Sequence, residues 1–288
     1  MTMQLFISGV IFGLSLGSIF FLMTIGLSLC FGLMRIISLD QLLYYSVGAY
    51  ITYSVGLLTG NVWLGIAAGV IVGGLTALAV ERIVFRRIYD RDLPFTMITS
   101  FGVLIGGVGV IKYFWGLVPR PVAEPIAAQV FIAGTEIPIY RLVIIGIAAL
   151  VYVGIWLFLN RTIIGKAIRA GTEDVEHVEG LGINVYRLFT ITFVIAGGLS
   201  GLAGGLQAPL IMVDPQMGLD VLAFVFMVVI IGGLGSLPGA LLGGLLIGVS
   251  EALAGLVFQP SMKSAVSFGL LILVLLLRPQ GLLGKEVR

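Results

Sequence analysis

The sequence predicts an all-α polytopic integral membrane protein with about eight to ten transmembrane helices and one short helix in a cytoplasmic loop. Of its 288 residues, 59% are hydrophobic and only 10% are charged, whereas soluble domains carry about 25% charged residues. A water-soluble fold of this size would lack the polar side chains needed to cover its surface. The 41 glycines show no collagen-like period and are typical of close helix packing in a membrane. The composition therefore excludes a soluble enzyme.

The charged residues are segregated into short connectors. Nineteen of the 30 charged side chains fall in residues 81–92, 161–187 and 278–288. Six long runs contain no charge: 1–34, 41–80, 93–111, 142–160, 188–213 and 221–250. Because a membrane-spanning helix needs about 20 apolar residues, most of these runs can cross a bilayer at least once. The first run has no basic start and is too long for a cleavable signal peptide.

The first two uncharged runs are each too long for one straight membrane span. Residues 5–34 would form a helix of about 45 Å at 1.5 Å per residue, which exceeds the hydrocarbon thickness of about 30 Å. This helix is therefore strongly tilted, broken near Gly13–Gly17 or partly re-entrant. Residues 41–80 contain a turn signal, Thr59–Asn61, between two stretches of about 18 residues. They are predicted to form a helical hairpin.

A loop and three further spans complete the predicted topology. Residues 116–140 carry four prolines and the β-prone patch VFIAGTEIPIY, so a short exposed β-hairpin is expected there. The sequence GGLGSLPG at 232–239 would break a regular helix. It divides the run from 221 into two spans, the second ending near residue 256. The last span, about 262–277, is short and can snorkel Lys263. The total is nine crossings.

Lysine and arginine assign the two sides of the membrane. If Arg35 and the three charged segments face the cytoplasm, that side holds 12 of the 16 basic residues. Alternation of the nine spans then places the N-terminus outside and residues 116–140 in an external loop. Residues 161–187 form a cytoplasmic loop, and the C-terminus lies inside. We expect residues 1–288 to form a single transmembrane domain in a plasma (inner) membrane of bacterial type.

The cytoplasmic loop contains a predicted short helix. Thr172 is the expected N-cap, and acids such as Asp174 follow it, where the helix dipole favours negative charge. The helix should stop at Gly180–Gly182. Val178 lies on an apolar face with the residues three positions before and after it. Because two or three turns are not stable alone, the helix must dock on its own membrane domain or on a soluble partner.

Few groups could carry chemistry inside the membrane. The candidates are Asp40, Asp214, Asp220 and Glu251. Asp214 precedes Pro215 in a predicted external loop and Asp220 precedes an apolar run, so both are interpreted as turn or capping residues. Asp40 could start the next helix. Glu251 lies deep in a span, where a carboxylate requires a hydrogen-bonding partner or a polar pathway. A structural contact and a pore-lining role are both open for Glu251.

No catalytic, metal or nucleotide site is predicted. The lone His177 has no second histidine or cysteine near it, as a zinc site would require, and the lone Cys30 suits a structural thiol. The pair Gly284–Lys285 lacks the hydroxyl residue and following helix of a P-loop. Any ATP must therefore be hydrolysed by another polypeptide. A net charge of +2 without a basic patch does not indicate nucleic-acid binding.

Three segments carry a family resemblance. Residues 165–205, GKAIRAGTEDVEHVEGLGINVYRLFTITFVIAGGLSGLAGG, resemble the cytoplasmic-loop signature of the branched-chain amino-acid ABC transporter permeases of the LivH type. The segments IGGLGSLPGALLGGLLIGVSEAL at 231–253 and RPQGLLGK at 278–285 match the same family in the right order. The length and number of spans agree over almost the whole chain.

The resemblance implies a membrane subunit of an ATP-driven importer for branched-chain amino acids or a related small polar solute such as an amide or urea. It implies a second permease of the same superfamily, two ATP-binding subunits and an external solute-binding protein as partners, besides membrane lipid. No cofactor is expected on this chain. The residues implied to couple to the ATPase are Ala170, Gly171, Thr172, Asp174, Val178, Gly180, Leu181 and Gly182.

Candidates for the translocation path combine intramembrane polar residues with the predicted helix break, since irregular backbone is tolerated in a membrane where it lines protein or a cavity. These candidates are Asp40, Gln41, Glu251, Gly232, Gly233, Gly235, Ser236 and Pro238. One departure concerns residues 37–42, ISLDQL, where the family usually has a stretch like Asn-Phe-Ala-His-Gly. The following SVGAY at 46–50 matches. This departure leaves the substrate open.

A second class of function is also consistent with the sequence. An ion-gradient-driven secondary transporter of small solutes would use Glu251 and Asp40 as proton or sodium carriers. It predicts transport by the purified chain alone, independent of ATP. An integral-membrane enzyme would need a constellation of catalytic residues with suitable spacing, and the sequence offers none.

Overall fold

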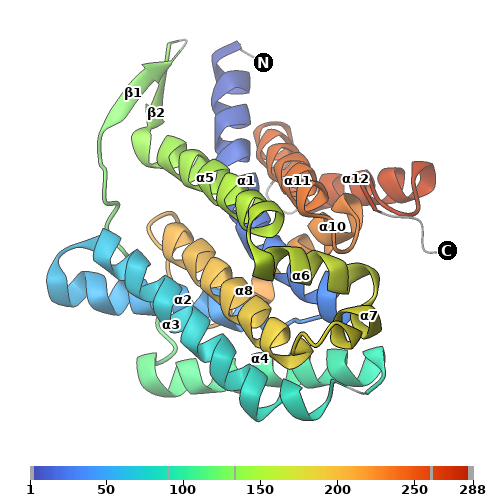
Figure 1. The fold of residues 1–288 in the computed structure, drawn as a ribbon. Helices are drawn as coiled ribbons and strands as arrows, with labels where there is room; N and C mark the ends of the chain where they lie inside the picture. The colour runs from blue at the N-terminus through green and yellow to red at the C-terminus, as the bar shows by residue number, and fades with distance from the viewer. Residues whose placement is uncertain (1–2, 90, 133, 260–261, 285–288) are drawn as a thin grey trace.

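The computed structural model describes residues 3–89, 91–132, 134–259 and 262–284 of the chain (Figure 1). Long apolar helices dominate it. In chain order these are α1 (Met3–Met34), α2 (Gln41–Thr59), α3 (Val62–Ile83), α4 (Leu93–Trp115), α5 (Ile139–Arg161), α8 (Val185–Gln207), α10 (Leu222–Gly232), α11 (Leu237–Val257) and α12 (Lys263–Leu277). The shorter elements are η1 (Phe85–Arg87), β1 (Gln129–Ile132), β2 (Thr135–Pro138), α6 (Ile163–Glu173), α7 (Val175–Gly180) and α9 (Met217–Asp220).

The predicted class, an all-α polytopic membrane protein, is confirmed. Among the described residues, six helices are long and apolar enough to cross a membrane, namely α1, α3 with η1, α4, α5, α8 and α11. The nine predicted spans correspond to the nine long helices above. One of them is corrected: α10 has 11 residues, about 16 Å at 1.5 Å per residue, which is half of the hydrocarbon core.

Helix α1 runs unbroken from Met3 to Met34, so of the three alternatives for this run the break near Gly13–Gly17 is excluded. The glycines instead let α11 approach the backbone of α1. A Cβ added at Gly13 would lie 2.5 Å from the Cα of Val249, and one at Gly17 would lie 2.6 Å from the carbonyl oxygen of Gly244. Small residues that bring two backbones together are the usual device for helix association in a membrane.

A second glycine-rich contact joins α2, α3 and α8. A Cβ at Gly48 of α2 would lie 2.2 Å from the Gly201 oxygen of α8, and one at Gly69 of α3 would lie 2.8 Å from the Gly48 oxygen. The turn predicted between α2 and α3 is present. Gly60 has a positive φ of 69°, and the Asn61 side chain caps α3 by accepting the Trp63 N–H at 3.0 Å.

The two ends of the bundle differ. At one end, the top of Figure 1, the predicted hairpin β1–β2 lies beside the start of α1, where the Thr135 hydroxyl donates to the Gln4 oxygen at 3.4 Å. We call this the hairpin end. The opposite end carries residues 84–89 and 91–92, the helices α6 and α7, and the turn after α10 (Figure 1), and we call it the loop end.

The connection between α8 and α10 folds back into the membrane domain. Residues 214–220 were predicted to lie in an external loop or at its edge. A Cβ at Gly218 of α9 would lie 2.6 Å from the Leu42 oxygen and 2.7 Å from the Ser46 hydroxyl. Both contacts are near the start of α2, whereas α2 reaches the hairpin end at Thr59. The external-loop prediction is therefore wrong for α9, because the short α10 must begin inside the bundle.

Candidate functional site

The predicted coupling loop folds into two short helices, α6 and α7. The Thr162 hydroxyl caps α6 by accepting the Gly165 N–H at 2.9 Å. Asp174 caps α7, with its Oδ1 accepting the His177 N–H at 3.1 Å. Thr172 was expected to be the cap, and this is wrong. Its hydroxyl lies in the last turn of α6 and donates to the Arg169 oxygen at 2.7 Å, so a carboxylate takes the capping position.

Asp174 is exposed, yet its surroundings favour the charged form. The backbone N–H of His177 donates to it, and the His177 ring nitrogen Nδ1 lies 2.5 Å from its Oδ2. These hydrogen bonds hold the pKa of the Asp174 carboxyl below its usual range because they stabilise the ionised carboxylate. The start of α7 thus carries a fixed negative charge at neutral pH.

The loop docks on its own membrane domain through a few residues. Val178 is buried in an apolar cluster with Leu33, and a Cβ at Gly171 would lie 2.5 Å from the Leu33 side chain. The expectation that Leu181 shares this buried face is wrong. Helix α7 ends at Gly180 and Leu181 is 78% exposed. Gly182 then reverses the chain with a φ of 78°.

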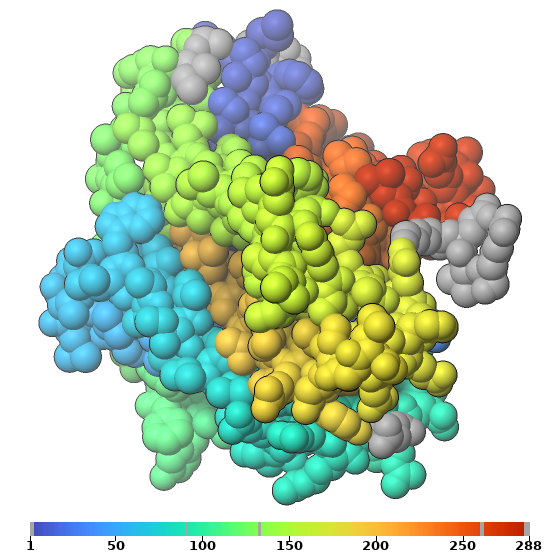
Figure 2. Space-filling model, in the orientation of Figure 1, coloured from blue at the N-terminus to red at the C-terminus, as the bar shows by residue number. Residues whose placement is uncertain are grey.

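The outward side of the loop remains accessible. Ala170, Thr172, Asp174, Gly180 and Leu181 are all exposed, and Figure 2 shows α6 and α7 on the surface. A polar groove of about 300 Å³ lies beside them. It is lined by Asn160, Lys166, Arg169, Ala170 and Glu173. This end of the molecule thus presents a polar groove together with the exposed Leu181.

The predicted helix break at GGLGSLPG lies at the loop end. Helix α10 stops at Gly232, and α11 starts with Pro238 in its first turn, capped by the Ser236 hydroxyl, which accepts the Gly239 N–H at 3.1 Å. A Cβ at Gly235 would lie 3.3 Å from the Cα of Gly32 in α1. The break is thus the turn that joins the half-helix α10 to α11 beside the end of α1.

The C-terminal segment packs on the same turn. The Leu282 N–H donates to the Ile231 oxygen at 2.7 Å, and the Leu283 N–H donates to the Gly232 oxygen at 3.2 Å. Gly233 has a φ of 94°, and a Cβ there would lie 2.4 Å from the Gly284 nitrogen. On the other side, a Cβ at Gly32 would lie 3.4 Å from the Thr172 methyl group of α6. The three family-like segments therefore meet at one end of the molecule.

Asp40 and Gln41 lie inside the subunit in a hydrogen-bond network. The Ser38 hydroxyl donates to Asp40 Oδ1 at 2.5 Å, and the Tyr44 hydroxyl donates to Oδ2. The Gln41 amide nitrogen donates to the Ser38 hydroxyl at 3.3 Å, and its oxygen accepts the Ser200 hydroxyl at 2.9 Å. With Cys30, whose sulfur is 3.7 Å from the Gln41 amide nitrogen, we call these residues the inner network.

Burial distinguishes the inner network from a lining of the molecular surface. Asp40 is 0% and Gln41 is 1% exposed. Asp40 occupies the N-cap position of α2, but its side chain makes no capping hydrogen bond. Its carboxylate is turned instead toward the hydroxyls of the network. The assignment of Asp40 and Gln41 to the translocation path stays a prediction.

Glu251 has a partner on the neighbouring helix. The Ser267 hydroxyl of α12 donates to Glu251 Oε2 at 2.8 Å, and the Ser250 and Ser267 hydroxyls are 3.5 Å apart. Ser267 is fully buried. Of the two roles left open by the sequence, the interhelical contact is thus present, and the pore-lining role stays a prediction.

Sequence reasoning missed a buried carboxylate at Glu81. This residue is 0% exposed, accepts the Tyr89 hydroxyl at 2.8 Å and accepts the Thr190 hydroxyl of α8 at 3.1 Å. Glu81 joins the end of α3 to the segment after η1 and to α8. Glu81 directly follows the uncharged run 41–80 and precedes Arg82. This position was the signal that α3 continues past the expected boundary, to Ile83.

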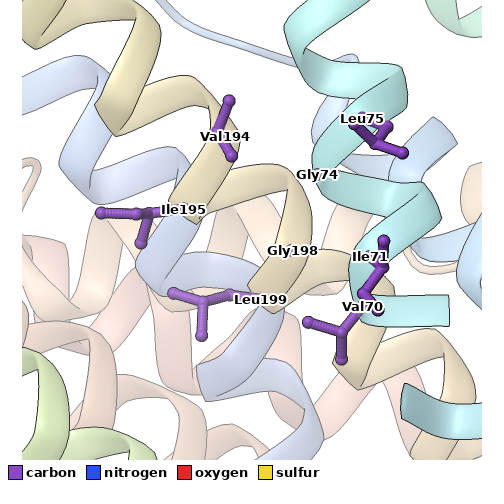
Figure 3. Close-up of a pocket in the computed structure, with 8 residues that line it drawn as sticks. All are labelled: Val70, Ile71, Gly74, Leu75, Val194, Ile195, Gly198 and Leu199. Carbon is purple, nitrogen blue, oxygen red and sulfur yellow. The ribbon is translucent and has the colours of Figure 1, made fainter. Parts of the chain in front are cut away.

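An apolar hollow of about 360 Å³ lies between α3 and α8 (Figure 3). Its lining consists of Val70, Ile71, Gly74, Leu75, Val194, Ile195, Gly198 and Leu199. All of these side chains are aliphatic or absent, so none can hydrogen-bond a polar solute. The hollow suits hydrocarbon on the surface of a membrane protein and is not a solute site.

The structure combines apolar helices that can cross a membrane, the short helix α10 and a loop, α6 and α7, that packs on one end of the bundle. This arrangement is that of a polytopic membrane permease. The sequence profile described as branched-chain amino acid transport system / permease component matches residues 9–275. The chain belongs to this family, and the resemblance noted from its three segments is confirmed.

Individual relatives agree over nearly the full length. The chain is 32% identical to the high-affinity branched-chain amino acid transport system permease protein BraD of Pseudomonas aeruginosa, over 95% of this chain and 94% of that protein. It is 30% identical to the permease protein LivH of Escherichia coli, over the same shares. A solved structure, PsaBC from Streptococcus pneumoniae in complex with Fab, aligns with a TM-score of 0.45 and 13% identity, covering 96% of this chain and 91% of that chain.

Proposed function

We propose that the chain is the membrane subunit of an ATP-binding-cassette importer for branched-chain amino acids or a closely related small polar solute. The observation that carries the proposal is the loop end, where the three family-like segments assemble around α6 and α7. The family is described as a branched-chain amino acid transport permease component. BraD and LivH are named as permeases of such systems, which supports this substrate class.

The loop end is the proposed docking surface for two ATP-binding subunits, which would hydrolyse the ATP. The exposed Leu181 offers an apolar contact, and the groove beside α6 offers polar ones. Tight packing of Gly171 on Leu33 and of Gly32 near Gly235 makes the loop continuous with α1 and with the turn before α11. Movement of a docked ATPase would therefore shift these helices and bias the permease between inward-open and outward-open states.

The sides of the bundle suit a second permease. Helices α4 and α5 leave large apolar side chains uncovered, such as Ile98 at 74% and Leu150 at 73% exposure. A second permease and lipid would share these faces. We propose that the loop end faces the cytoplasm of a bacterial-type inner membrane and that the hairpin end, with the N-terminus, receives an external solute-binding protein. This orientation follows the positive-inside rule.

Copurification and ATP hydrolysis test this proposal. The chain, coexpressed with the permease, ATPase and binding-protein genes that neighbour it, should purify with two ATPase subunits and should import leucine in proteoliposomes only when ATP is present. The Leu181→Asp variant should assemble in the membrane but lose at least about tenfold of the binding-protein-stimulated ATPase rate, because a charge replaces the apolar contact.

The matched control is Leu181→Met, which keeps an apolar side chain at this 78% exposed position and should leave ATPase stimulation unchanged. Purification without any ATPase would overturn the proposal. So would leucine transport by the chain alone under an imposed ion gradient, the behaviour of a secondary transporter.

A further inference from the structure

The chain between α8 and α10 brings carboxylates into the interior of the membrane domain. Gly218 of α9 contacts Leu42 and Ser46, and Ser46 lies 13 residues before the end of α2 at Thr59. At 1.5 Å per residue, α9 is therefore about 20 Å below the hairpin end. Asp220, the last residue of α9, shares this depth. A discontinuous helix near the middle of a membrane is a common place for a transport site.

Asp220 has no structural partner in the part of the chain that the structure describes. It is exposed, and neither α9 nor the following α10 has a side-chain cap at its start. The sequence-based interpretation of Asp220 as a capping residue is therefore wrong. A carboxylate facing lipid at this depth would be very costly. Asp220 must consequently face water or a polar group between the permease subunits.

A buried tyrosine points to the same place. Tyr45 of α2 is 0% exposed, and its hydroxyl has no hydrogen-bond partner among the described residues. Tyr45 is adjacent to Ser46, whose hydroxyl contacts Gly218 of α9, two residues before Asp220. Because buried hydroxyls are almost always hydrogen-bonded in native proteins, this unused hydroxyl indicates a place for a polar group beside Asp220.

A second level of the same arrangement lies nearer the hairpin end. Arg120, in the loop after α4, pairs with Val213 through backbone hydrogen bonds of 2.9 and 2.8 Å. This pairing brings Arg120 close to the next residue, Asp214. Tyr50 of α2 packs on Trp115 at the end of α4, with ring centroids 5.2 Å apart, and Trp115 precedes Arg120 by five residues. Its hydroxyl and the Arg120 Nε are buried without a hydrogen-bond partner in the described structure.

Within the described residues, the Arg120 guanidinium does not form a salt bridge with the carboxylate of Asp214 or Asp220. Asp214 uses Oδ1 to accept the Gln216 N–H at 2.7 Å, a turn role that matches its sequence-based interpretation, and Oδ2 makes no such bond. A guanidinium and carboxylates that form no ion pair with one another suit a ligand that carries both charges itself.

We propose that Arg120, Asp214, Asp220, Tyr45 and Tyr50 form this subunit's half of a binding site for a zwitterionic amino acid on the translocation path. The Arg120 guanidinium binds the ligand carboxylate, and the Asp214 and Asp220 carboxylates bind its ammonium group. The tyrosine hydroxyls supply the remaining hydrogen bonds. A neutral amide or urea would not require this separation of charge. The inference rests on the proposed function and narrows its substrate class.

Leucine uptake by the complete complex tests the site. In proteoliposomes with saturating binding protein and ATP, Asp220→Asn and Arg120→Gln should each lower the maximal rate of leucine uptake per complex at least tenfold. Both variants should still bind their ATPase subunits. Asp220→Glu should retain most of the uptake. This variant keeps the negative charge at position 220 and is the matched control for Asp220→Asn.

Thiol labelling supplies a readout that a purely structural role would not affect. A cysteine at Asp220 in the assembled complex should react with a charged, membrane-impermeant methanethiosulfonate, and leucine should slow that reaction. Ile71→Cys, in the apolar hollow of α3 and α8, should not react, and the native Cys30 is fully buried. Absence of labelling at position 220, or leucine uptake by Asp220→Asn at the wild-type rate, overturns the inference.

The proposed function and the proposed binding site would be contradicted by different results. A wild-type complex that imports no amino acid contradicts the proposed function. A wild-type complex that imports leucine while the Asp220 and Arg120 variants transport equally well contradicts only the site. Uptake of leucinol, which keeps the ammonium group of leucine but lacks the carboxylate, as fast as leucine would remove the proposed role of Arg120.

Discussion

Two neighbouring tyrosines on α2 belong to two regions that differ in whether their polar groups are hydrogen-bonded. The Tyr44 hydroxyl donates to Asp40 inside the inner network, where Ser38 and Gln41 complete the hydrogen bonds. The Tyr45 hydroxyl, one residue later, has no partner among the described residues. We call the second region, made of Tyr45, Tyr50, Arg120, Asp214 and Asp220, the outer break.

The difference separates groups that hold the fold from groups available to a ligand. Asp40 is fully buried and accepts two hydroxyls, so its polar atoms are satisfied and it joins the start of α2 to the linker before it. Asp220 is exposed without any such donor. Since an unmade hydrogen bond is costly inside a protein, a complete network indicates structure, and unpaired groups in an interior position indicate function.

Removing the Asp40 carboxylate should have the largest effect on stability. Asp40→Ala leaves the buried hydroxyls of Ser38 and Tyr44 without their acceptor. At about 1–3 kcal/mol for each unpaired group, the free energy of unfolding should fall by about 4 kcal/mol. Thermal unfolding of the purified complex in detergent measures this. Asp40→Asn, which keeps one acceptor oxygen, should lose less, and normal stability of Asp40→Ala would show that the inner network is not structural.

A smaller loss of stability should follow from one methyl group between α2 and α8, the helices that support both regions. In Gly204→Ala the new Cβ would lie 1.9 Å from the Tyr45 carbonyl oxygen. Backbone cannot move away cheaply, so we expect a loss of about 3 kcal/mol in the free energy of unfolding. The matched control is Gly106→Ala in α4, where no described atom lies within 4 Å and stability should hold or rise slightly.

Glu251 offers an intermediate case that sharpens the comparison. Its carboxylate accepts one buried donor, Ser267, so Glu251→Ala should cost about 1 kcal/mol of unfolding free energy. Glu251→Gln keeps the acceptor and should match the wild type in both stability and leucine uptake. A transport defect in Glu251→Gln with normal thermal stability would move Glu251 from the structural class to the functional one.

The smallest effect is expected at the start of α7. The folded-state pKa of Asp174 is lowered, so its contribution is complete above the ordinary aspartate pKa of about 3.9 and is lost as pH falls through the folded-state value. At neutral pH, Asp174→Ala should speed amide hydrogen exchange of residues 175–182 about fivefold by removing the cap. Asp174→Asn keeps the capping oxygen, and its exchange should stay close to that of the wild type.

Much of the fold could be predicted because its signals are local. Segregation of charge and the length of the apolar runs identified the membrane helices. Turn residues placed the α2–α3 turn at Gly60 and the hairpin β1–β2 within residues 116–140, and GGLGSLPG marked the junction of α10 and α11. In the coupling loop the end at Gly180 was right, whereas the cap was displaced from Thr172 to Asp174, since hydroxyls and carboxylates are both good caps.

The depth and pairing of polar groups could not be predicted in the same way. Asp214 and Asp220 follow a helix and precede an apolar run, as residues of an external loop do. Only the return of the chain onto α2 at Gly218 places α9 inside the bundle. Glu81 likewise gained the Thr190 hydroxyl from α8, which packs on α3, and no periodicity in the sequence records this contact.

The sequence by itself determined the class of protein, the family and the positions where helices begin and end, because these depend on the local balance of apolar, charged and turn-forming residues. The tertiary structure alone decided which carboxylates are paired and which are left for a ligand. A hydrogen bond depends on a partner within about 3 Å, and in a bundle of helices that partner commonly comes from a distant part of the chain. Glu81 accepts the Thr190 hydroxyl of α8, whereas Asp220 has no such donor among the described residues.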